Sequence, residues 1–433
     1  MSIGRLDLAI SIGLPDPPLS TGLPHPPAFT GRAARRARII MHLNAQLNAH
    51  TRAALEATDE DLIVFDLAGI EAQYDSLLRE LPGISVRFAM KSCPVDEVLS
   101  RLAEKGSGFD AASPNEIAQA LRTGVPADRI HYGNTIKSDG NIAEAHRLGV
   151  RTFATDSLED VAATAAHAAG SRVFCRLATS GEGALWGLSR KFGCSGTDAV
   201  LVMEAARSAG LTPAGLSVHV GSQQMTSEAW QDAFERIADV LTELNRRGIH
   251  PDHINLGGGL PAAGYLDSRG IPLDPPLDKM FAVIREGIQH LGAVSESPLD
   301  FVMEPGRHLV ADHGTIRAHV SRLSSRRQMD GEREHWLYLS CGKFNGLYEM
   351  DQLQYRLLFP SDPGTGHVPA VVAGPTCDSD DAYDHRHNRV SVPGSAASGD
   401  PVWILSSGAY ATGYMTQGFN GFDPLPYTCV EGG

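Results

Sequence analysis

The sequence predicts an α/β protein in which a parallel (β/α)8 barrel is followed by an antiparallel β-barrel or β-sandwich domain. Two observations support this prediction. Between residues 68 and 312, eight short apolar runs alternate with helix-like segments, as the strands and helices of a barrel do. Between residues 313 and 433 the helical periodicity fades, and short β-type runs lie between Gly, Pro and Asp turns.

Two further segments precede the barrel. Residues 1–31 are rich in proline, with glycine and serine, which is typical of a flexible or extended arm. We expect residues 32–67 to form an N-terminal segment that packs with the β domain. Within it, the pattern favours a helix at 41–57 and a strand at 61–67.

The barrel prediction depends on the order of its elements. Several helix-like segments end at glycine, as helix C-termini often do. The predicted strands are 85–91, 108–113, 130–134, 152–156, 173–179, 215–221, 253–259 and 301–307. The predicted helices include 94–106, 114–124, 142–149, 198–210 and 229–248.

The predicted β domain contains four apolar runs, at 315–323, 335–341, 370–377 and 400–410. Residues 361–369 and 385–400 are expected to be loops, because they are rich in Gly, Pro, Asp and Ser.

Composition excludes several classes of function. The 37 basic and 51 acidic side chains give a net charge of −14, which disfavours a nucleic acid or an anionic membrane as partner. The sequence has no apolar run long enough to span a bilayer and no secretory signal pattern. Its six cysteines form no C-x-x-C pair, so we expect no metal site and a reducing, cytoplasmic compartment.

The stretch FAMKSC, residues 88–93, ends the first predicted barrel strand. The run SVRFAM is short and apolar and follows the turn signal Pro82-Gly83, so Lys91 comes where the strand stops. Burying an unpaired ammonium is costly. Lys91 therefore either snorkels to the surface or is a desolvated lysine that forms a Schiff base with a carbonyl cofactor.

Polar residues fall at the carboxyl ends of the predicted strands, and this pattern favours the functional interpretation of Lys91. In a (β/α)8 barrel the active site lies on that face. The polar residues and glycines at these ends are Lys91, Asp110, Asn134, Asp156, Arg176, His219, Gly257, Gly258, Gly259 and Glu304.

The loops after the seventh and eighth strands predict a phosphate site. Barrel enzymes often bind phosphate there, and the sequence places Gly257–Gly259 and Arg307 in these loops, with Ser222 available. A phosphate and a buried lysine together suggest pyridoxal phosphate (PLP), which needs a charged partner for its ring nitrogen. Glu304 is placed to be that partner. His219 either stacks on the ring or is a satisfied core histidine.

Seven motifs in order, between about residues 61 and 423, resemble the fold-type III PLP decarboxylases, the family of ornithine, lysine and diaminopimelate decarboxylases. The motifs are FAMKSC, GFDAAS, VHVGSQ, NLGGG, EPGR, GPTCDSDD and GAYATGYMTQGFNGF. The resemblance implies an alanine racemase-like, PLP-binding TIM barrel that acts on a small-molecule amino-acid substrate.

The resemblance also implies roles for individual residues. Lys91 would be joined to PLP, Glu304 would pair with the pyridine nitrogen, and His219 would stack on the ring. Asp110 and Arg176 would line the site, and Glu116 would support Lys91. The implied phosphate contacts are Ser222, Gly257, Gly258, Gly259, Gly306, Arg307 and Tyr410.

Members of this family are homodimers with the active sites at the subunit interface. By resemblance, Cys377 and Asp378 would come from the second subunit, and Cys377 would protonate the carbanion after CO₂ leaves. Phe419 would belong to the wall near the cofactor.

The resemblance implies a substrate with a distal ammonium, ornithine or lysine, bound by Asp378 with Tyr348 and Glu349 as further contacts. The segment FNGLYEM departs from the wording usual in ornithine decarboxylases. A non-basic amino acid in specialised metabolism therefore stays open as the substrate. Three further functions stay open as well: a diaminopimelate-type decarboxylase, a racemase, and a non-catalytic, partner-binding homologue.

Overall fold

The computed structural model describes residues 47–188, 190–384 and 388–431. Contacts divide the chain into residues 1–47 and residues 48–433, and the description below concerns the second unit. The predicted proline-rich arm and the part of the N-terminal segment up to residue 46 lie outside the described residues.

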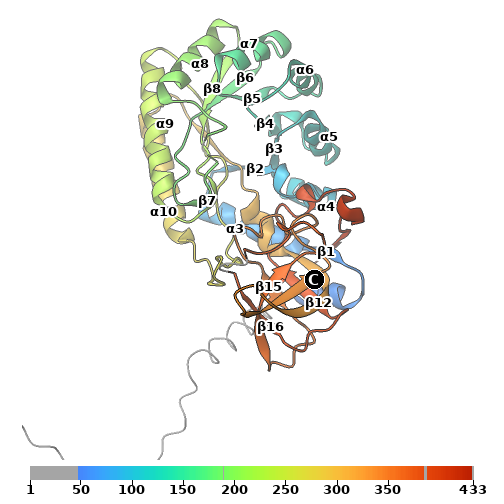
Figure 1. Ribbon diagram of the computed structural model, residues 1–433. Helices are drawn as coiled ribbons and strands as arrows, with labels where there is room; N and C mark the ends of the chain where they lie inside the picture. The colour runs from blue at the N-terminus through green and yellow to red at the C-terminus, as the bar shows by residue number, and fades with distance from the viewer. Residues whose placement is uncertain (1–46, 189, 385–387, 432–433) are drawn as a thin grey trace, which may run out of the picture. The chain divides into compact units, whose positions relative to one another are not determined.

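Eight parallel strands close into a barrel, as the sequence predicts (Figure 1). Their order around the barrel is β10-β11-β2-β3-β4-β5-β6-β8, so each strand pairs with the next one along the barrel sequence. The strands are β2 (Ser85–Ala89), β3 (Gly108–Ala111), β4 (Ile130–Tyr132), β5 (Thr152–Thr155), β6 (Arg172–Arg176), β8 (Thr212–Ser217), β10 (His253–Asn255) and β11 (Asp300–Met303).

Helices alternate with these strands. They are α3 (Leu67–Glu80), α4 (Asp96–Glu104), α5 (Pro114–Arg122), α6 (Asp139–Arg147), α7 (Leu158–His167), α8 (Gly196–Ser208), α9 (Glu228–Arg246), α10 (Leu277–Val294) and α11 (Arg307–Val310). A further helix, α2 (Ala49–Glu56), precedes β1 (Leu62–Asp66). Within the described ranges, no helix combines the length and apolar character needed to cross a bilayer.

Local sequence signals explain where these helices begin and end. The helix α5 begins with Ser113, whose hydroxyl accepts a hydrogen bond from the Glu116 amide, and has Pro114 in its first turn. The chain then leaves the helix at Gly124, which has a φ of 87°. Only glycine adopts this left-handed conformation without strain.

The β domain is one curled eight-stranded sheet. Its strands are β1, β12 (Gly314–Arg327), β13 (Arg333–Leu339), β14 (Arg356–Leu358), β15 (His367–Ala373), β16 (Val390–Pro393), β17 (Pro401–Leu405) and β18 (Tyr427–Val430). A separate two-stranded sheet, β7 (Ala184–Trp186) with β9 (Ser222–Gln224), extends from the barrel loops. Short 3-10 turns complete the chain: η1 (Met90–Ser92), η2 (Ala127–Arg129), η3 (Ala311–His313), η4 (Thr412–Tyr414) and η5 (Phe419–Gly421).

The sheet differs from the prediction in two respects. Most pairs are antiparallel, but β13 pairs with β15 and β1 pairs with β18 in parallel. The strand β15 begins inside the predicted loop 361–369, and β16 lies inside the predicted loop 385–400. Both loop predictions were wrong at these points, because flanking prolines and glycines hid strands of only a few residues.

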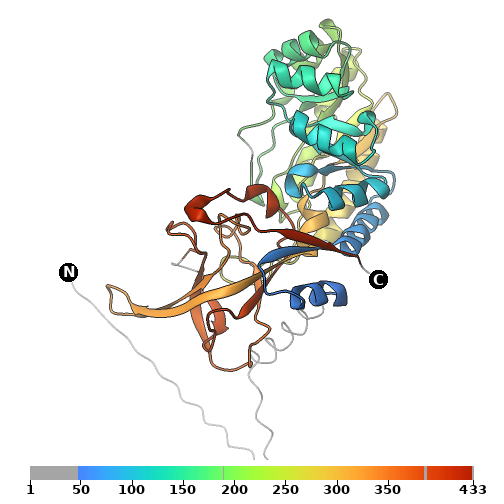
Figure 2. The same cartoon turned by 90° about the vertical axis from the view of Figure 1, so that its right-hand side faces the viewer.

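The strand β1 pairs with strands of the β domain that lie far from it in the sequence. It pairs antiparallel with β12, Leu62 opposite Arg317, and parallel with β18. Figure 2 shows these first and last strands side by side. The barrel is thus an insertion between two strands of one sheet.

Two neutral histidines meet inside the barrel. The His131 and His253 rings are 5.0 Å apart at an interplanar angle of 81°, and both contact Phe174. Their strands, β4 and β10, are not neighbours, so these contacts cross the barrel interior. Burial lowers the pKa of His253 from 6.5 to about 4, and burial with the facing His253 lowers the pKa of His131 well below its ordinary value.

We predict that acid destabilises the protein through these imidazoles. Their folded-state pKa values lie below the unfolded value, so the stability they contribute is present above pH 6.5 and is lost as the pH falls toward about 4. Urea denaturation at fixed protein concentration should show this loss. The variant His131→Phe should lose part of the pH dependence, whereas His290→Asn, at an exposed site on α10, should retain it. An unchanged pH dependence in His131→Phe would contradict the assignment.

Candidate active site

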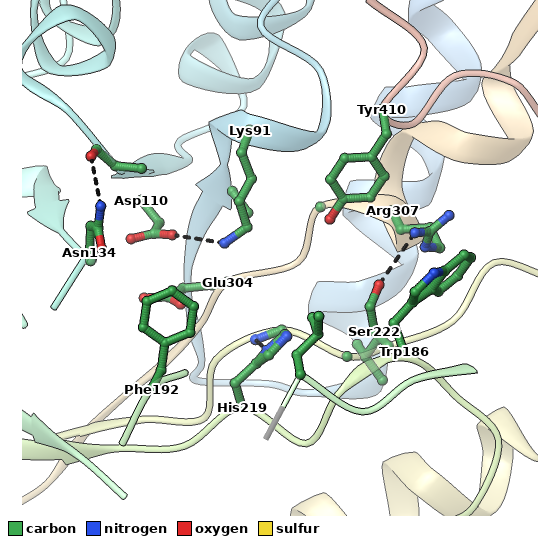
Figure 3. Close-up of a pocket in the computed structure, with 18 of the residues that line it drawn as sticks. Lys91, Asp110, Asn134, Trp186, Phe192, His219, Ser222, Glu304, Arg307 and Tyr410 are labelled. Atoms are coloured by element: carbon green, nitrogen blue, oxygen red, sulfur yellow. Dashed lines mark hydrogen bonds and ion pairs between the residues drawn. The ribbon is translucent and has the colours of Figure 1, made fainter. Parts of the chain in front are cut away.

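A cavity of about 610 Å³ lies at the carboxyl ends of the barrel strands and is also lined by loops of the β domain. Figure 3 shows the side chains that face it. The predicted site residues that line the cavity are Lys91, Asp110, Arg176, His219, Ser222, Gly258, Gly259, Glu304, Gly306, Arg307, Tyr348, Glu349 and Tyr410.

Lys91 stands in the turn η1, directly after β2, and points into the cavity (Figure 3). The turn is fixed by Ser92, whose hydroxyl donates to the Ala89 carbonyl at 2.8 Å and whose carbonyl accepts from the Tyr410 amide at 2.6 Å. The Lys91 side chain is 53% exposed, but this exposed part faces the cavity. Lys91 therefore does not extend to the outer surface of the protein, as the snorkelling alternative would require.

Two carboxylates surround the Lys91 ammonium. Asp110 Oδ2 lies 3.8 Å from Lys91 Nζ, and Glu304 lines the same cavity. Burial acts to lower the pKa of Lys91, but Asp110, Tyr410 and Glu304 together outweigh burial and raise it above its ordinary value. Burial, followed by the charge of Asp110, raises the pKa of Glu304 to about 7. An acid poised near neutrality suits a partner that can itself be protonated, such as a pyridine nitrogen.

His219 has a fixed orientation and a defined tautomer. The Gly258 amide donates a hydrogen bond to His219 Nδ1 at 3.1 Å, so the ring proton is on Nε2. Burial, together with Arg176, lowers the pKa of His219 well below its ordinary value. The ring therefore faces the cavity as a neutral imidazole.

Arg307 lies on the other side of the cavity (Figure 3), where it forms an anion cradle with Gly258, Gly259 and Gly306. Arg307 Nη2 donates to Ser222 Oγ at 3.3 Å. The backbones of Gly258 and Gly259 come so close to their neighbours that a Cβ at Gly259 would lie 2.6 Å from Val220 Cγ2. Glycine at these positions lets amide groups approach a bound anion.

Two buried polar atoms in this cavity have no hydrogen-bond partner: Asp110 Oδ1 and Arg307 Nε. Buried polar groups are normally paired, so unpaired ones on side chains that line a cavity are consistent with a place for a polar ligand. One is an acceptor on the carboxylate beside the lysine, and the other is a donor in the anion cradle. The residues therefore fit a ligand with an aldehyde-bearing ring at one end and a phosphate at the other.

Several predicted residues lie elsewhere in this single chain. Gly257 precedes the cradle, and its φ is 64°. Glu116 accepts a hydrogen bond from the Ala112 amide at 2.6 Å. Cys377, Asp378 and Phe419 are exposed and do not line the cavity.

The loop that contains Cys377 is nevertheless well organised. Asp381 is buried and accepts hydrogen bonds from the Thr376 amide, the Thr376 hydroxyl and the Lys343 amide. The Cys377 amide donates to Asn420 Oδ1 at 2.9 Å, and Cys377 Sγ lies 3.2 Å from the same oxygen. This loop therefore presents an exposed thiol in a fixed conformation.

Sequence reasoning missed several residues that line the cavity. Trp186 and Phe192 come from the β7–β9 region, and Lys343 and Tyr414 come from the β domain. Lys343 Nζ lies 3.7 Å from Asp351 Oδ2, so this second lysine is paired within the wall. The aromatic residues near 186–192 were the available signal, but that segment has no strand periodicity.

A barrel whose first strand ends at a cavity lysine, opposite a glycine and arginine cradle, has the arrangement expected of a PLP enzyme. Residues 67–311 match the family model for the pyridoxal binding domain of pyridoxal-dependent decarboxylases. The chain is 31% identical over 375 residues to the lysine/ornithine decarboxylase of Selenomonas ruminantium, covering 85% of this chain and 89% of that protein. It is 29% identical over 385 residues to the ornithine decarboxylase of Schizosaccharomyces pombe, covering 86% of this chain and 84% of that protein.

Solved structures agree with these matches. The lysine/ornithine decarboxylase of Vibrio vulnificus complexed with cadaverine has a TM-score of 0.75 and 27% identity, covering 88% of this chain and 97% of that chain. SrLDC in complex with PLP and cadaverine has a TM-score of 0.76 and 26% identity, covering 88% and 94%. The chain belongs to the pyridoxal-dependent decarboxylase family, and its enzyme class is that of PLP-dependent carboxy-lyases.

Substitution of Gly133 would test how closely the residues around Asp110 are packed. A Cβ at Gly133 would lie 1.7 Å from Asp110 Oδ1, so Gly133→Ala must displace the carboxylate beside Lys91. We expect a loss of about 1–3 kcal/mol in the free energy of unfolding, measured by urea denaturation. Gly140→Ala is the control, since a Cβ there meets nothing within 4 Å; it should leave stability unchanged or raise it by up to about 1 kcal/mol. Equal stability of the two variants would contradict this packing.

Proposed function

We propose that this enzyme removes the α-carboxylate of an L-amino acid with a distal ammonium, ornithine or lysine, as CO₂ and releases the corresponding amine. The observation that supports this most directly is the cavity that joins Lys91, Asp110 and Glu304 to the Arg307 cradle. The names of the relatives, ornithine and lysine/ornithine decarboxylases, support the substrate class.

We propose that PLP spans this cavity. Lys91 would supply the amine that holds the cofactor aldehyde, and Glu304 would face the ring nitrogen. His219 would stack on the ring as a neutral imidazole, with Asp110 and Arg176 beside it. Ser222, Gly258, Gly259, Gly306, Arg307 and Tyr410 would hold the phosphate. Gly257 shapes the approach to that cradle. When bound, PLP withdraws electrons from the substrate Cα as the carboxylate leaves.

Glu304 has a defined task in this proposal. Its carboxyl group has a pKa of about 7, so it can hold or release a proton near neutrality. A protonated pyridine nitrogen would favour its ionised form, because an opposite charge nearby lowers a carboxyl pKa. The residue would thereby keep the ring nitrogen protonated.

A second subunit would complete the site. Cys377 and Asp378 are exposed on an ordered loop outside the cavity of their own chain. In the proposed homodimer this loop reaches the partner's cavity, where Cys377 returns a proton to Cα and Asp378 contacts the distal ammonium. All six cysteines are free, which suits the reducing cytoplasm that we propose as the compartment.

The cofactor assignment predicts a specific chemical label. Borohydride reduction of the purified, PLP-loaded protein should attach the cofactor to Lys91, because that amine faces Asp110 across the cavity. Peptide mapping by mass spectrometry measures the site. Lys91→Ala should lose the label, whereas Lys343→Ala, which removes the other cavity lysine, should retain it. A label on any other lysine would refute the assignment.

The substrate assignment predicts a charge effect at Asp378. Asp378→Asn should raise KM for ornithine and lysine by about tenfold or more, because charge-assisted hydrogen bonds contribute about 1.5–3 kcal/mol. The PLP absorption spectrum should stay intact. Asp380→Asn, at an exposed acid two residues away, is the matched control and should leave KM unchanged. A panel of amino acids assayed for CO₂ release would decide against the proposal if leucine or valine reacted faster than ornithine and lysine.

A further inference from the structure

The Arg307 guanidinium is already paired with a carboxylate inside the chain. Its Nη1 donates to Glu349 Oε2 and its Nη2 donates to Glu349 Oε1, both at 2.5 Å. The two side chains are only 3% and 8% exposed. Arg307 follows β11 in the barrel, whereas Glu349 stands in the loop after β13 in the β domain, so the pair also links the two parts of the site.

The other contacts of this guanidinium fix its plane. Nη1 also donates to the Tyr265 hydroxyl at 3.0 Å. The centre of the guanidinium lies 4.7 Å from the Trp186 ring and 4.8 Å from the Tyr410 ring. The rings beside it and Glu349 at its end restrict the orientation of Arg307.

This orientation leaves one edge of the guanidinium for another anion. A guanidinium offers two forks to oxygen ligands: an end fork of Nη1 and Nη2, and a side fork of Nε and Nη2. Glu349 occupies the end fork. The side fork contains Nε, which is buried without a partner, and Nη2, whose second proton points to Ser222. Ser222 and the adjacent glycines line the cavity at this edge.

The same pairing limits what else Glu349 can bind. Both of its oxygens receive a charge-assisted hydrogen bond from Arg307. To bind a substrate ammonium instead, it would have to give up two buried charge-assisted hydrogen bonds to Arg307, which is unfavourable.

We propose that Glu349 is a positioning residue of the cofactor phosphate site, which holds Arg307 so that its Nε–Nη2 fork faces the phosphate, and that Glu349 does not contact the distal ammonium of the substrate. This assignment rests on the proposed function of the cavity as a PLP site. It replaces the role in substrate binding expected for Glu349 from the sequence. Recognition of the distal ammonium is left to Asp378.

The test compares two cofactor forms on the same protein. Apo-protein of the wild type and of Glu349→Gln is titrated with PLP and with pyridoxal, which has the same ring but no phosphate. Binding is followed by the fluorescence of the protein, since Trp186 stacks beside Arg307. We expect the Kd for PLP to rise about tenfold in Glu349→Gln, the effect of losing one charge-assisted contact, while the Kd for pyridoxal stays unchanged.

Two further variants make the result specific. Glu349→Asp keeps the charge but shortens the side chain by one methylene, so it should also weaken PLP binding, even if Glu349→Gln fails to fold. Asp351→Asn removes a neighbouring cavity acid that pairs with Lys343 and should leave the Kd for PLP unchanged. At saturating PLP, the KM of Glu349→Asp for ornithine or lysine should equal that of the wild type.

The opposite results overturn the inference. Unchanged or tighter PLP binding by both Glu349 variants would show that this carboxylate does not position Arg307. A rise in KM at saturating PLP, with normal PLP affinity, would show that Glu349 contacts the substrate. Failure of the wild type to bind either PLP or pyridoxal would refute the proposed function itself, a result distinct from failure of the Glu349 assignment.

Discussion

The buried guanidinium of Arg307 is the constraint on which the rest of the site depends. A charge removed from water must be fully paired, and the partners of Arg307 come from three parts of the chain. Glu349 belongs to the β domain, Trp186 to the β7–β9 sheet, and Tyr265 to the segment after β10. Satisfying this one group fixes how the β domain meets the carboxyl face of the barrel. The cavity is the space left between them.

At the opposite end of the cavity, the cost of burying charge has a different effect: it shifts the pKa values of the charged groups. Burial raises the pKa of Asp110, and burial together with the charge of Asp110 raises the pKa of Glu304. Asp110 keeps one oxygen without a partner. The surrounding fold holds these unpaired polar atoms and the groups with shifted pKa values in place. The site is therefore preorganised for a charged ligand.

The sequence predicted much of this arrangement because barrel strands have short apolar runs with polar residues at one end. That pattern located all eight strands and placed Lys91, Asp110, His219 and Glu304 on one face. It missed Trp186, because a three-residue strand has too little periodicity to detect. It gave no sign that Glu349 pairs with Arg307, since contacts between residues 42 positions apart follow from tertiary packing and not from a local motif. The domain limits and the roles of Cys377 and Asp378 remain predictions.

The insertion of the barrel between β1 and β12 has a consequence for biosynthesis. Arg317 hydrogen-bonds to the carbonyl of Asp59, 258 residues earlier, and β18 adds the final neighbour of β1. During synthesis, β1 therefore leaves the ribosome before either of its partner strands. The barrel is translated in the interval and can fold through its local βα contacts. The sheet can close around β1 only after β12 and β18 have been translated. Because β12 and β18 cover both edges of β1, this strand finds its two partners only after the barrel has been translated.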